Sequence, residues 1–245
     1  MLHFFSKKQI LKDLIPDGHL DFHSHLLPGI DDGAKNAGTT VSLVRAMQDL
    51  RIAQLITTPH VMKNVWDNTE QSILATLEQT RQTLQSQNIA IPVSAAAEYL
   101  MDGSFVEHFR HNRLLTIKDN YVLVEMSYLN PPIQLYEILF ELQVAGYKPI
   151  LAHPERYLFY HANFPEYAKL KNAGCAFQLN LLSVVGYYGS AVARTAVKLL
   201  EKGLIDFAGS DVHHAQHIAA FSDRVVTREV QPISEALAHN QLFRP

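Results

Sequence analysis

The chain has 245 residues, of which 47% are hydrophobic and 18% are charged, and its formal net charge is -3 at pH 7. This length and apolar content suffice for a full core and favour one large domain over two small ones. The small negative charge excludes an electrostatic basis for binding nucleic acid. The single cysteine, Cys175, excludes an intrachain disulfide and a cysteine-rich zinc site.

Residues 1–18 are interpreted as an N-terminal extension of a single domain that spans residues 1–245. Lysines follow a very short apolar patch there and no small-residue cleavage site follows, so the segment does not resemble a signal peptide. No apolar run in the chain reaches the roughly 18–20 residues needed to cross a bilayer. We therefore expect a cytoplasmic protein without a membrane span. Apolar residues of this segment that we expect to pack on the barrel are Leu2, Phe4, Phe5, Ile10, Leu11 and Leu14.

Seven short runs rich in Val, Ile, Leu or Phe predict strands that are buried on both faces, as in a parallel sheet. In chain order they are His19–His23, Gln54–Thr58, Ile91–Ala96, Tyr121–Met126, Lys148–Ala152, Ala176–Leu181 and Ile205–Ala208. Segments with helical spacing lie between and after them: Thr40–Leu50, Thr69–Gln87, Gly103–Arg110, Ile133–Ala145, Glu166–Asn172, Ala191–Lys202 and Ile233–Asn240. This alternation predicts an α/β fold, a TIM-like barrel of about seven strands in one domain.

Six of the seven predicted strands end in or are followed by His, Asp or Glu. His23 and His25 alternate about Ser24, so on an extended strand both imidazoles face the same side and can bind one ion. Asp211 and His213 repeat this spacing after the last strand. The other residues at strand ends are His60, Glu98, Glu125 and His153. Because active sites of such barrels lie at the carboxyl ends of the strands, the pattern predicts a metal centre at one rim.

Some nearby residues also have simpler interpretations. We interpret Asp31, in the turn-like Asp31-Asp32-Gly33, as a solvated turn residue. Glu125 lies in the apolar run YVLVEM, where an unpaired charge is costly, so it requires a cation. Arg156 follows His153 by three residues and is typical of a surface position, but beside a cluster of cations it would bind an anionic substrate oxygen. His214 and His217 lie near the rim without an assigned role.

The segments DFHSHLLPGIDDGAKN, TTPH, AHPER and GSDVHH, together with the isolated Glu98, resemble the polymerase and histidinol phosphatase (PHP) superfamily. More closely, they resemble its bacterial protein-tyrosine phosphatases, which act with tyrosine kinases that control capsule and exopolysaccharide export. The resemblance runs from about Asp21 to His214 and implies a distorted (β/α)7 barrel with three divalent metal ions. The ligand sets that it implies are His23, His25, Glu98 and Asp211 for one ion, Glu98, Glu125 and His153 for a second, and Asp32, His60 and His213 for a third.

The resemblance also implies the substrate and its contacts. Arg156 matches the phosphate-binding arginine of the family. A second arginine, expected a few residues after the final His, is absent from the stretch HAQHIAAF, and the nearest arginine is Arg224. Either Arg224 reaches the site to bind substrate, or His214 or His217 substitutes, or the substrate is held less tightly.

The implied cofactors are manganese ions, with zinc or iron as alternatives that the same mixture of ligands permits. The implied partner is the phosphorylated tail of a bacterial tyrosine kinase. Homo-oligomer formation is left open.

We expect in-line attack on phosphorus by a hydroxide that bridges the Glu98-bound metals. Arg156, which holds phosphate, and His213, a metal ligand, are the residues assigned to catalysis. A tyrosine leaving group, with a pKa near 10, does not need a strong general acid. The alternatives are histidinol-phosphate phosphatase or another small-molecule phosphoesterase of the same superfamily, an amidohydrolase, and a non-catalytic metal-binding module. An amidohydrolase favours a lysine at a mid-barrel strand end, and a non-catalytic module would be expected to have lost ligands or Arg156.

Overall fold

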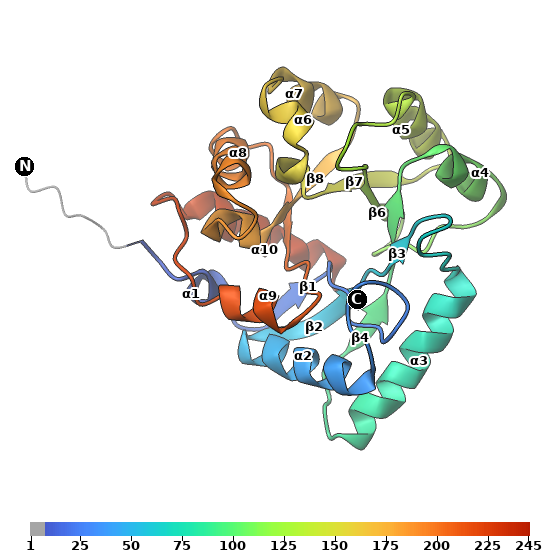
Figure 1. Ribbon diagram of the computed structural model, residues 1–245, viewed down its shortest axis with the longest axis vertical. Coiled ribbons are helices and arrows are strands. Elements are labelled where there is room, and N and C mark those ends of the chain that lie inside the picture. Colours follow the sequence, from blue (N-terminus) through green and yellow to red (C-terminus); the bar gives the residue numbers. More distant parts are fainter. Residues whose placement is uncertain (1–7) are drawn as a thin grey trace, which may run out of the picture.

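Parallel strands form a barrel in the computed structural model, which describes residues 8–245 (Figure 1). In chain order they are β1 (His19–Asp21), β2 (Ile52–Thr57), β3 (His60–Val61), β4 (Val93–Ala95), β5 (Glu98–Leu100), β6 (Tyr121–Glu125), β7 (Lys148–Ala152), β8 (Ala176–Asn180) and β9 (Phe207–Gly209). Every pairing between neighbouring strands is parallel, in the orders β1-β2-β4 and β3-β5-β6-β7-β8-β9.

Backbone hydrogen bonds join these two sheets into one circuit. β3 and β5 continue the chain just beyond β2 and β4, and the amide of Ala96 donates to the carbonyl of Thr57 at 2.9 Å across the junction. At the opposite seam, beside β1 and β9, the amide of Asp211 donates to the carbonyl of His23 at 2.7 Å, and His25 N donates to Val212 O at 2.9 Å. The circuit therefore has seven strand positions, and the predicted closed barrel is confirmed.

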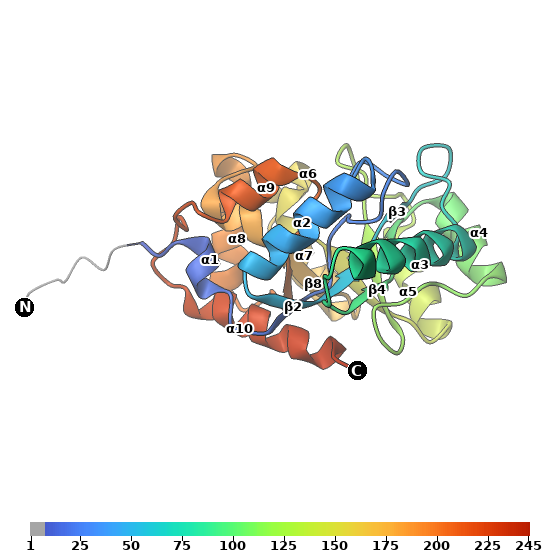
Figure 2. The ribbon, with the colours of Figure 1, turned by 90° about the horizontal axis from the view of Figure 1, so that it is seen from below.

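Helices surround the strands on the outside (Figures 1 and 2). They are α1 (Leu11–Leu14), α2 (Ala37–Asp49), α3 (Glu70–Ser86), α4 (Gly103–His111), α5 (Leu135–Val144), α6 (Leu158–His161), α7 (Pro165–Asn172), α8 (Ser190–Glu201), α9 (Ala215–Ala220) and α10 (Gln231–His239). Figure 2 shows α9 and α10 on opposite sides of the barrel. Next to α10, the side-chain amide of Asn240 donates to the carbonyls of Leu20 and Ala208, and Phe243 packs on Phe22. This apolar packing leaves the other end of the barrel for polar groups.

The predicted elements are present, with boundaries shifted by up to three residues. α2 begins three residues before the predicted start, because the side chain of Asn36 accepts from the amide of Thr39 and caps the helix there. The elements α1, α6, α9, β3 and β5 were not predicted, since each is too short to show a period. Of the N-terminal apolar residues, Leu11 is buried and Leu14 packs against the core, whereas Leu2, Phe4 and Phe5 lie outside the described residues.

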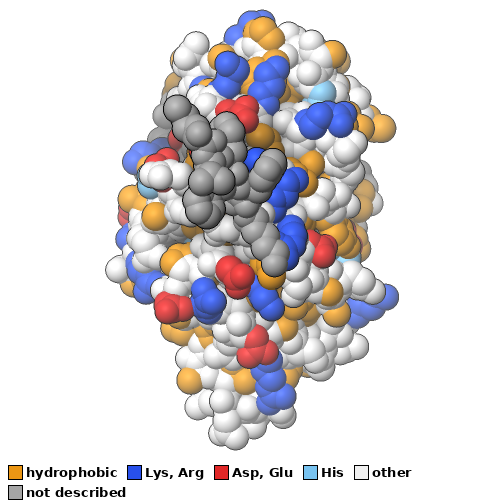
Figure 3. Space-filling model, turned by 90° about the vertical axis from the view of Figure 1, so that its left-hand side faces the viewer, with side chains coloured by type: hydrophobic (Ala, Val, Ile, Leu, Met, Phe, Trp, Pro, Cys, Tyr) orange, Lys and Arg blue, Asp and Glu red, His pale blue; other side chains and the backbone are white. Residues whose placement is uncertain are grey.

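The surface carries charges of both signs. On the face shown in Figure 3, Lys and Arg side chains are interspersed with Asp and Glu side chains. Among residues 8–245, none of the helices is both long enough and apolar enough to cross a membrane.

The buried imidazole of His19, the first residue of β1, should make the stability of the fold depend on pH. It is 1% exposed, and among the described residues neither ring nitrogen has a hydrogen-bond partner. Burial, with a smaller contribution from Arg244, lowers the pKa of His19 from 6.5 to about 4. Below about pH 6.5 the unfolded chain therefore binds a proton that the folded chain does not, so stability falls as the pH is lowered from 6.5 to 4.

We expect the wild type to lose about 2 kcal/mol more unfolding free energy than His19→Leu when the pH is lowered from 7 to 5. Urea unfolding at both pH values measures this difference. A chelator in all samples ensures that metal release at low pH does not contribute to it. Equal losses in the two proteins would contradict the assignment to His19.

Candidate metal centre

All nine predicted metal ligands gather at the carboxyl ends of the strands. They form four overlapping groups in which the candidate ligand atoms lie within 4.8 Å of one another. These groups contain no other residue of the described chain. Their members are His25, Asp32, His60 and His213; His23, Glu98 and His153; His23, His25 and Asp211; and His60, Glu98 and Glu125.

Glu98, the first residue of β5, lies at the middle of this cluster and is fully buried. Its Oε2 lies 3.3 Å from His23 Nε2, 3.4 Å from His25 Nε2 and 3.3 Å from His60 Nδ1. Its Oε1 lies 3.1 Å from His153 Nε2. One carboxylate is thus surrounded by four imidazole nitrogens from three different strand ends.

Asp211 completes the part of the cluster beside β1. Its Oδ1 lies 3.3 Å from His23 Nε2 and 3.4 Å from His25 Nε2. The two Nε2 atoms are 3.5 Å apart. A tetrahedral ion with bonds of about 2.1 Å would hold its ligand atoms about 3.4 Å apart, so the spacing within this group fits one ion.

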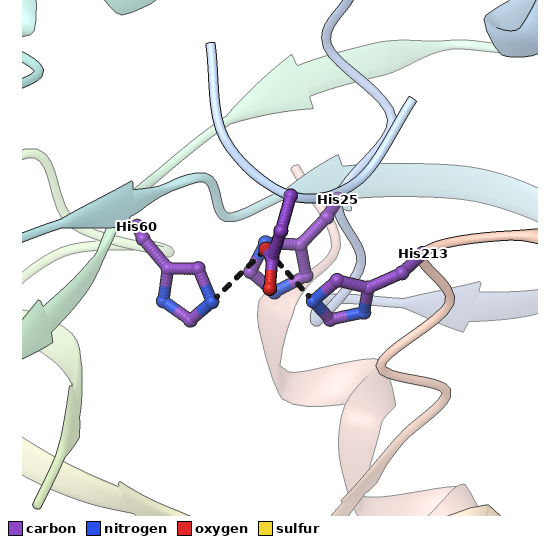
Figure 4. Close-up of side chains that lie close together, drawn as sticks. His25, His60 and His213 are labelled. Atoms are coloured by element: carbon purple, nitrogen blue, oxygen red, sulfur yellow. Dashed lines mark ion pairs between the residues drawn. The ribbon is translucent and has the colours of Figure 1, made fainter. Parts of the chain in front are cut away.

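A second part of the cluster lies between His60 and His213, which flank His25 (Figure 4). Asp32 Oδ1 lies 3.5 Å from His60 Nε2 and 3.4 Å from His213 Nε2. The rings of His25 and His213 stack with centroids 3.9 Å apart. Glu125 Oε1 approaches the other nitrogen of His60, Nδ1, at 2.9 Å. The carboxylates of Glu98, Glu125 and Asp32 thus surround His60.

The pKa values show that this cluster attracts positive charge. Burial alone lowers the pKa of His23, but the carboxylates of Glu98 and Asp211 raise it to about 10. Burial alone raises the pKa of Glu98, but His23 and His60 hold it well below its usual range. His213 and other imidazoles likewise lower the pKa of Asp32 to about 2, against the effect of burial. The carboxylates stay ionised and stabilise cations between them.

Hydrogen bonds on the outer nitrogens orient the imidazoles for metal binding. His23 Nδ1 donates to Gln178 Oε1 at 2.7 Å, and His25 Nδ1 donates to Asp31 Oδ2 at 2.8 Å. These oxygens can only accept, so in the neutral rings each Nε2 carries a lone pair directed at the cluster. His213 Nδ1 donates to the carbonyl of Asp211 at 2.9 Å and leaves its Nε2 facing Asp32 in the same way.

Buried polar atoms without hydrogen-bond partners also indicate that the cluster binds divalent metal ions. Among the described residues, both carboxylate oxygens of Glu98 and one of Glu125 are buried without a hydrogen-bond partner, and so are His60 Nδ1 and His153 Nδ1. An unpaired carboxylate in a protein interior is costly, and a metal ion removes that cost. The mixture of imidazole and carboxylate donors is one that first-row divalent metals accept.

Asp31 and Gln178 correct the interpretation made from sequence. Asp31 was interpreted as a solvated turn residue, but it is 8% exposed and orients His25, while its Oδ1 accepts from the amide of Gly33 at 3.0 Å. Gln178 belongs to β8, the one strand whose end carried no predicted ligand. An inward-facing amide on a buried strand has no distinctive sequence signal, so only its contact with His23 reveals it.

Two residues of the cluster have a left-handed backbone. His153, directly after β7, has φ 37°, and Asp211, two residues after β9, has φ 50°. This conformation is uncommon for residues other than glycine. It turns the chain sharply at both strand ends, where the imidazole and the carboxylate join the cluster. Such strained positions concentrate at functional sites.

Arg156 lies beside the cluster in a cavity of about 380 Å³. Its Nη1 donates to Asp211 Oδ2 at 2.9 Å. The guanidinium carbon lies over the rings of Tyr128 and Tyr188, 4.8 and 4.2 Å from their centroids. These two cation–π contacts hold the planar group at the cavity wall, where it can bind an anion. The other lining residues are Asp32, His60, Met62, Val65, Trp66, Glu125, His153, Asp211, His213, His214 and His217.

Arg224 does not line this cavity. It is exposed, its guanidinium donates to the carbonyl of Lys8 at 2.6 Å, and its backbone pairs with Ile10. The structure therefore does not support Arg224 as a substrate ligand, because the chain after α9 turns towards the N-terminal segment. His214 and His217 do line the cavity, as does Tyr188 from the loop after β8.

Gly33 lets the loop after β1 pack directly against the backbone of His25. A Cβ atom on Gly33 would lie 2.1 Å from the carbonyl oxygen of His25. We expect Gly33→Ala to displace the loop that carries Asp31 and Asp32 and to weaken metal affinity about 10–100-fold. The matched control is Gly103→Ala, whose Cβ would meet nothing within 4 Å. Isothermal titration with Mn²⁺ compares them, and equal affinities in the two variants would contradict this prediction.

Comparisons with known proteins find a matching family and several relatives. The model of a family described as capsular polysaccharide synthesis, CpsB/CapC, matches residues 19–225. Tyrosine-protein phosphatase YwqE of Bacillus subtilis is 29% identical over 198 residues, covering 80% of this chain and 78% of the relative. Tyrosine-protein phosphatase CpsB of Streptococcus pneumoniae is 25% identical over 203 residues, covering 80% and 83%.

Solved structures with the same fold were also found. One from a study of YwqE from B. subtilis and CpsB from S. pneumoniae, described as unique metal-dependent tyrosine phosphatases, superposes with a TM-score of 0.76 at 28% identity and covers 81% of each chain. Histidinol phosphate phosphatase from Lactococcus lactis, solved with zinc, L-histidinol and phosphate, superposes with a TM-score of 0.51 at 12% identity, covering 93% and 94% of the two chains. At 12% identity, the similarity to histidinol phosphate phosphatase shows a shared fold alone.

Proposed function

The chain belongs to the capsular polysaccharide synthesis family CpsB/CapC, and from this premise we propose that it is a metal-dependent protein-tyrosine phosphatase. The observation that carries the proposal is the buried Glu98 carboxylate with four imidazole nitrogens 3.1–3.4 Å away and Arg156 in the adjoining cavity. The relatives named as tyrosine-protein phosphatases, and the similar structure described as metal-dependent, support it.

We assign the nine clustered residues as ligands of three divalent ions, most readily manganese. The spacing among His23, His25, Glu98 and Asp211 supports one ion. Glu98 with Glu125 and His153 would hold a second ion, and Asp32 with His60 and His213 a third. The position of His60, whose two nitrogens face Glu125 and Asp32, makes it a candidate ligand of either neighbouring ion.

Bound divalent ions would supply a water nucleophile at neutral pH and would offset charge on the phosphoryl oxygens. The chain contributes positioning and charge. Asp211 and the two tyrosine rings hold the Arg156 guanidinium at the cavity wall, where its remaining N–H groups can bind phosphoryl oxygens that gain charge in the transition state. The phenolate of tyrosine, with a pKa near 10, leaves without a strong general acid.

We infer that the physiological substrate is the phosphorylated tail of a bacterial tyrosine kinase, met in the cytoplasm. The family's description connects it with capsular polysaccharide synthesis, and the named relatives act on phosphotyrosine. The cavity also suits an aryl group, because Trp66, Tyr128 and Tyr188 line it together with the polar cluster.

Phosphate release from a phosphotyrosine peptide and from histidinol phosphate, measured side by side with manganese and with chelator, tests the function. We expect manganese-dependent release mainly from the peptide, with little from the matching phosphoserine peptide, whose alkoxide is a poorer leaving group. Phosphate release mainly from histidinol phosphate would contradict the proposed substrate but leave the proposed metal centre unchanged. Release that persists after the metal is chelated would refute the mechanism.

A further inference from the structure

A second cavity lies next to the catalytic one and shares a wall with it. Its volume is about 510 Å³, and it is bounded by the segment 61–69 on one side and by β5 and α4 on the other. Trp66 lines both cavities. Trp66 is therefore the partition between the proposed active site and an unassigned space beside it.

This partition is held in place by hydrogen bonds. The backbones of Met62 and Trp66 bond to each other in both directions, at 3.0 and 2.7 Å, and close a tight turn. The side-chain amide of Asn68 donates to the carbonyl of His60 at 2.9 Å and to the carbonyl of Ile30 at 2.8 Å. Because His60 belongs to the metal cluster, the position of Trp66 is tied to the catalytic cavity. The second cavity thus keeps a defined place relative to the phosphate.

Aromatic residues form one part of the wall of the second cavity, beside polar residues. Tyr99 and Phe105 are 3% and 4% exposed, and their ring centroids lie 5.4 Å apart. The ring of His108 lies 6.0 Å from Tyr99. Lys63 also lines the cavity, together with the acidic residues Asp67 and Glu107. An aromatic side chain matches these walls because aromatic rings pack at such centroid distances.

We propose that this cavity is a substrate subsite that binds an aromatic side chain of the phosphopeptide itself, within three residues of the phosphotyrosine. The inference rests on the proposed phosphatase function and deepens it. An extended peptide advances about 3.3–3.6 Å per residue, so a chain that crosses the Trp66 partition brings a neighbouring residue over the second cavity. Small aryl phosphates reach only the catalytic cavity and do not use the subsite.

Peptide kinetics with the full-length manganese enzyme test the subsite. The substrates are p-nitrophenyl phosphate and seven-residue peptides with a central phosphotyrosine, in which Phe replaces Ala at each flanking position in turn. We expect Phe at one position to raise kcat/KM about fivefold over the all-Ala peptide, a factor typical of one aromatic contact. His111→Trp, which fills the cavity from its exposed rim, removes this preference and leaves p-nitrophenyl phosphate turnover unchanged.

Arg113→Trp is the matched control, because Arg113 is exposed two residues further on and does not line the cavity. It should keep the preference. The wild-type chain offers a readout without turnover, because Trp66 is its single tryptophan. In chelator, the preferred Phe peptide should change Trp66 fluorescence at a concentration several-fold lower than the all-Ala peptide.

Hydrolysis of every peptide at the same rate, or loss of the preference in both Trp variants, would overturn the subsite and leave the phosphatase function standing. Failure to hydrolyse p-nitrophenyl phosphate and all peptides would instead overturn the phosphatase function together with the subsite.

Discussion

Replacing Glu98 with glutamine is expected to lower kcat/KM for an aryl phosphate by about 10³-fold or more, with the barrel still folded. Glutamine has nearly the shape of glutamate but lacks its negative charge. Glu98 is the one carboxylate within 3.4 Å of four imidazole nitrogens, and neither of its oxygens has a hydrogen-bond partner among the described residues. Loss of its charge removes the attraction that holds cations at the centre of the site.

Metal content and turnover, measured together, check this prediction. Glu98→Gln should lose bound metal after gel filtration, whereas Glu78→Gln, an exposed change on α3, should retain both metal and activity. Because the fold does not depend on this charge, circular dichroism should be unchanged. A Glu98→Gln protein with full metal content and turnover within tenfold of wild type would refute the central role of Glu98.

Replacing Arg156 with lysine is expected to lower kcat/KM for phosphotyrosine about 10²-fold while metal content stays near wild type. Lysine keeps the charge but cannot present two parallel N–H groups to phosphate oxygens, and it packs less well over Tyr128 and Tyr188. Arg156→Ala should lose more, because the positive charge is then also absent.

Separate values of kcat and KM, with metal analysis, distinguish two roles for Arg156. Because its Nη1 also bonds Asp211, a loss of activity that follows a loss of metal would mean that Arg156 acts by holding a ligand, and would contradict direct phosphate binding. Arg110→Lys, an exposed change in an ion pair on α4, is the control and should leave both constants unchanged.

Much of the barrel could be predicted from sequence because each βα unit is a local pattern. β7, for example, matches the predicted Lys148–Ala152 in both bounds. Buried parallel strands are short apolar runs, and polar residues at their ends stand out against that background. The short strands β3 and β5 could not be predicted, since they depend on pairing with neighbours far along the chain.

The sequence by itself determined which residue types lie at the strand ends, because the two-residue period of His23 and His25 and the position of Glu98 after an apolar run are local features. Only the tertiary structure decided how they combine. It placed Asp31 and Gln178 behind the imidazoles, turned Arg224 towards Lys8, and set Trp66 between two cavities. These contacts join residues as far as 216 positions apart. Their partners are chosen by barrel closure and side-chain packing, which no local pattern encodes.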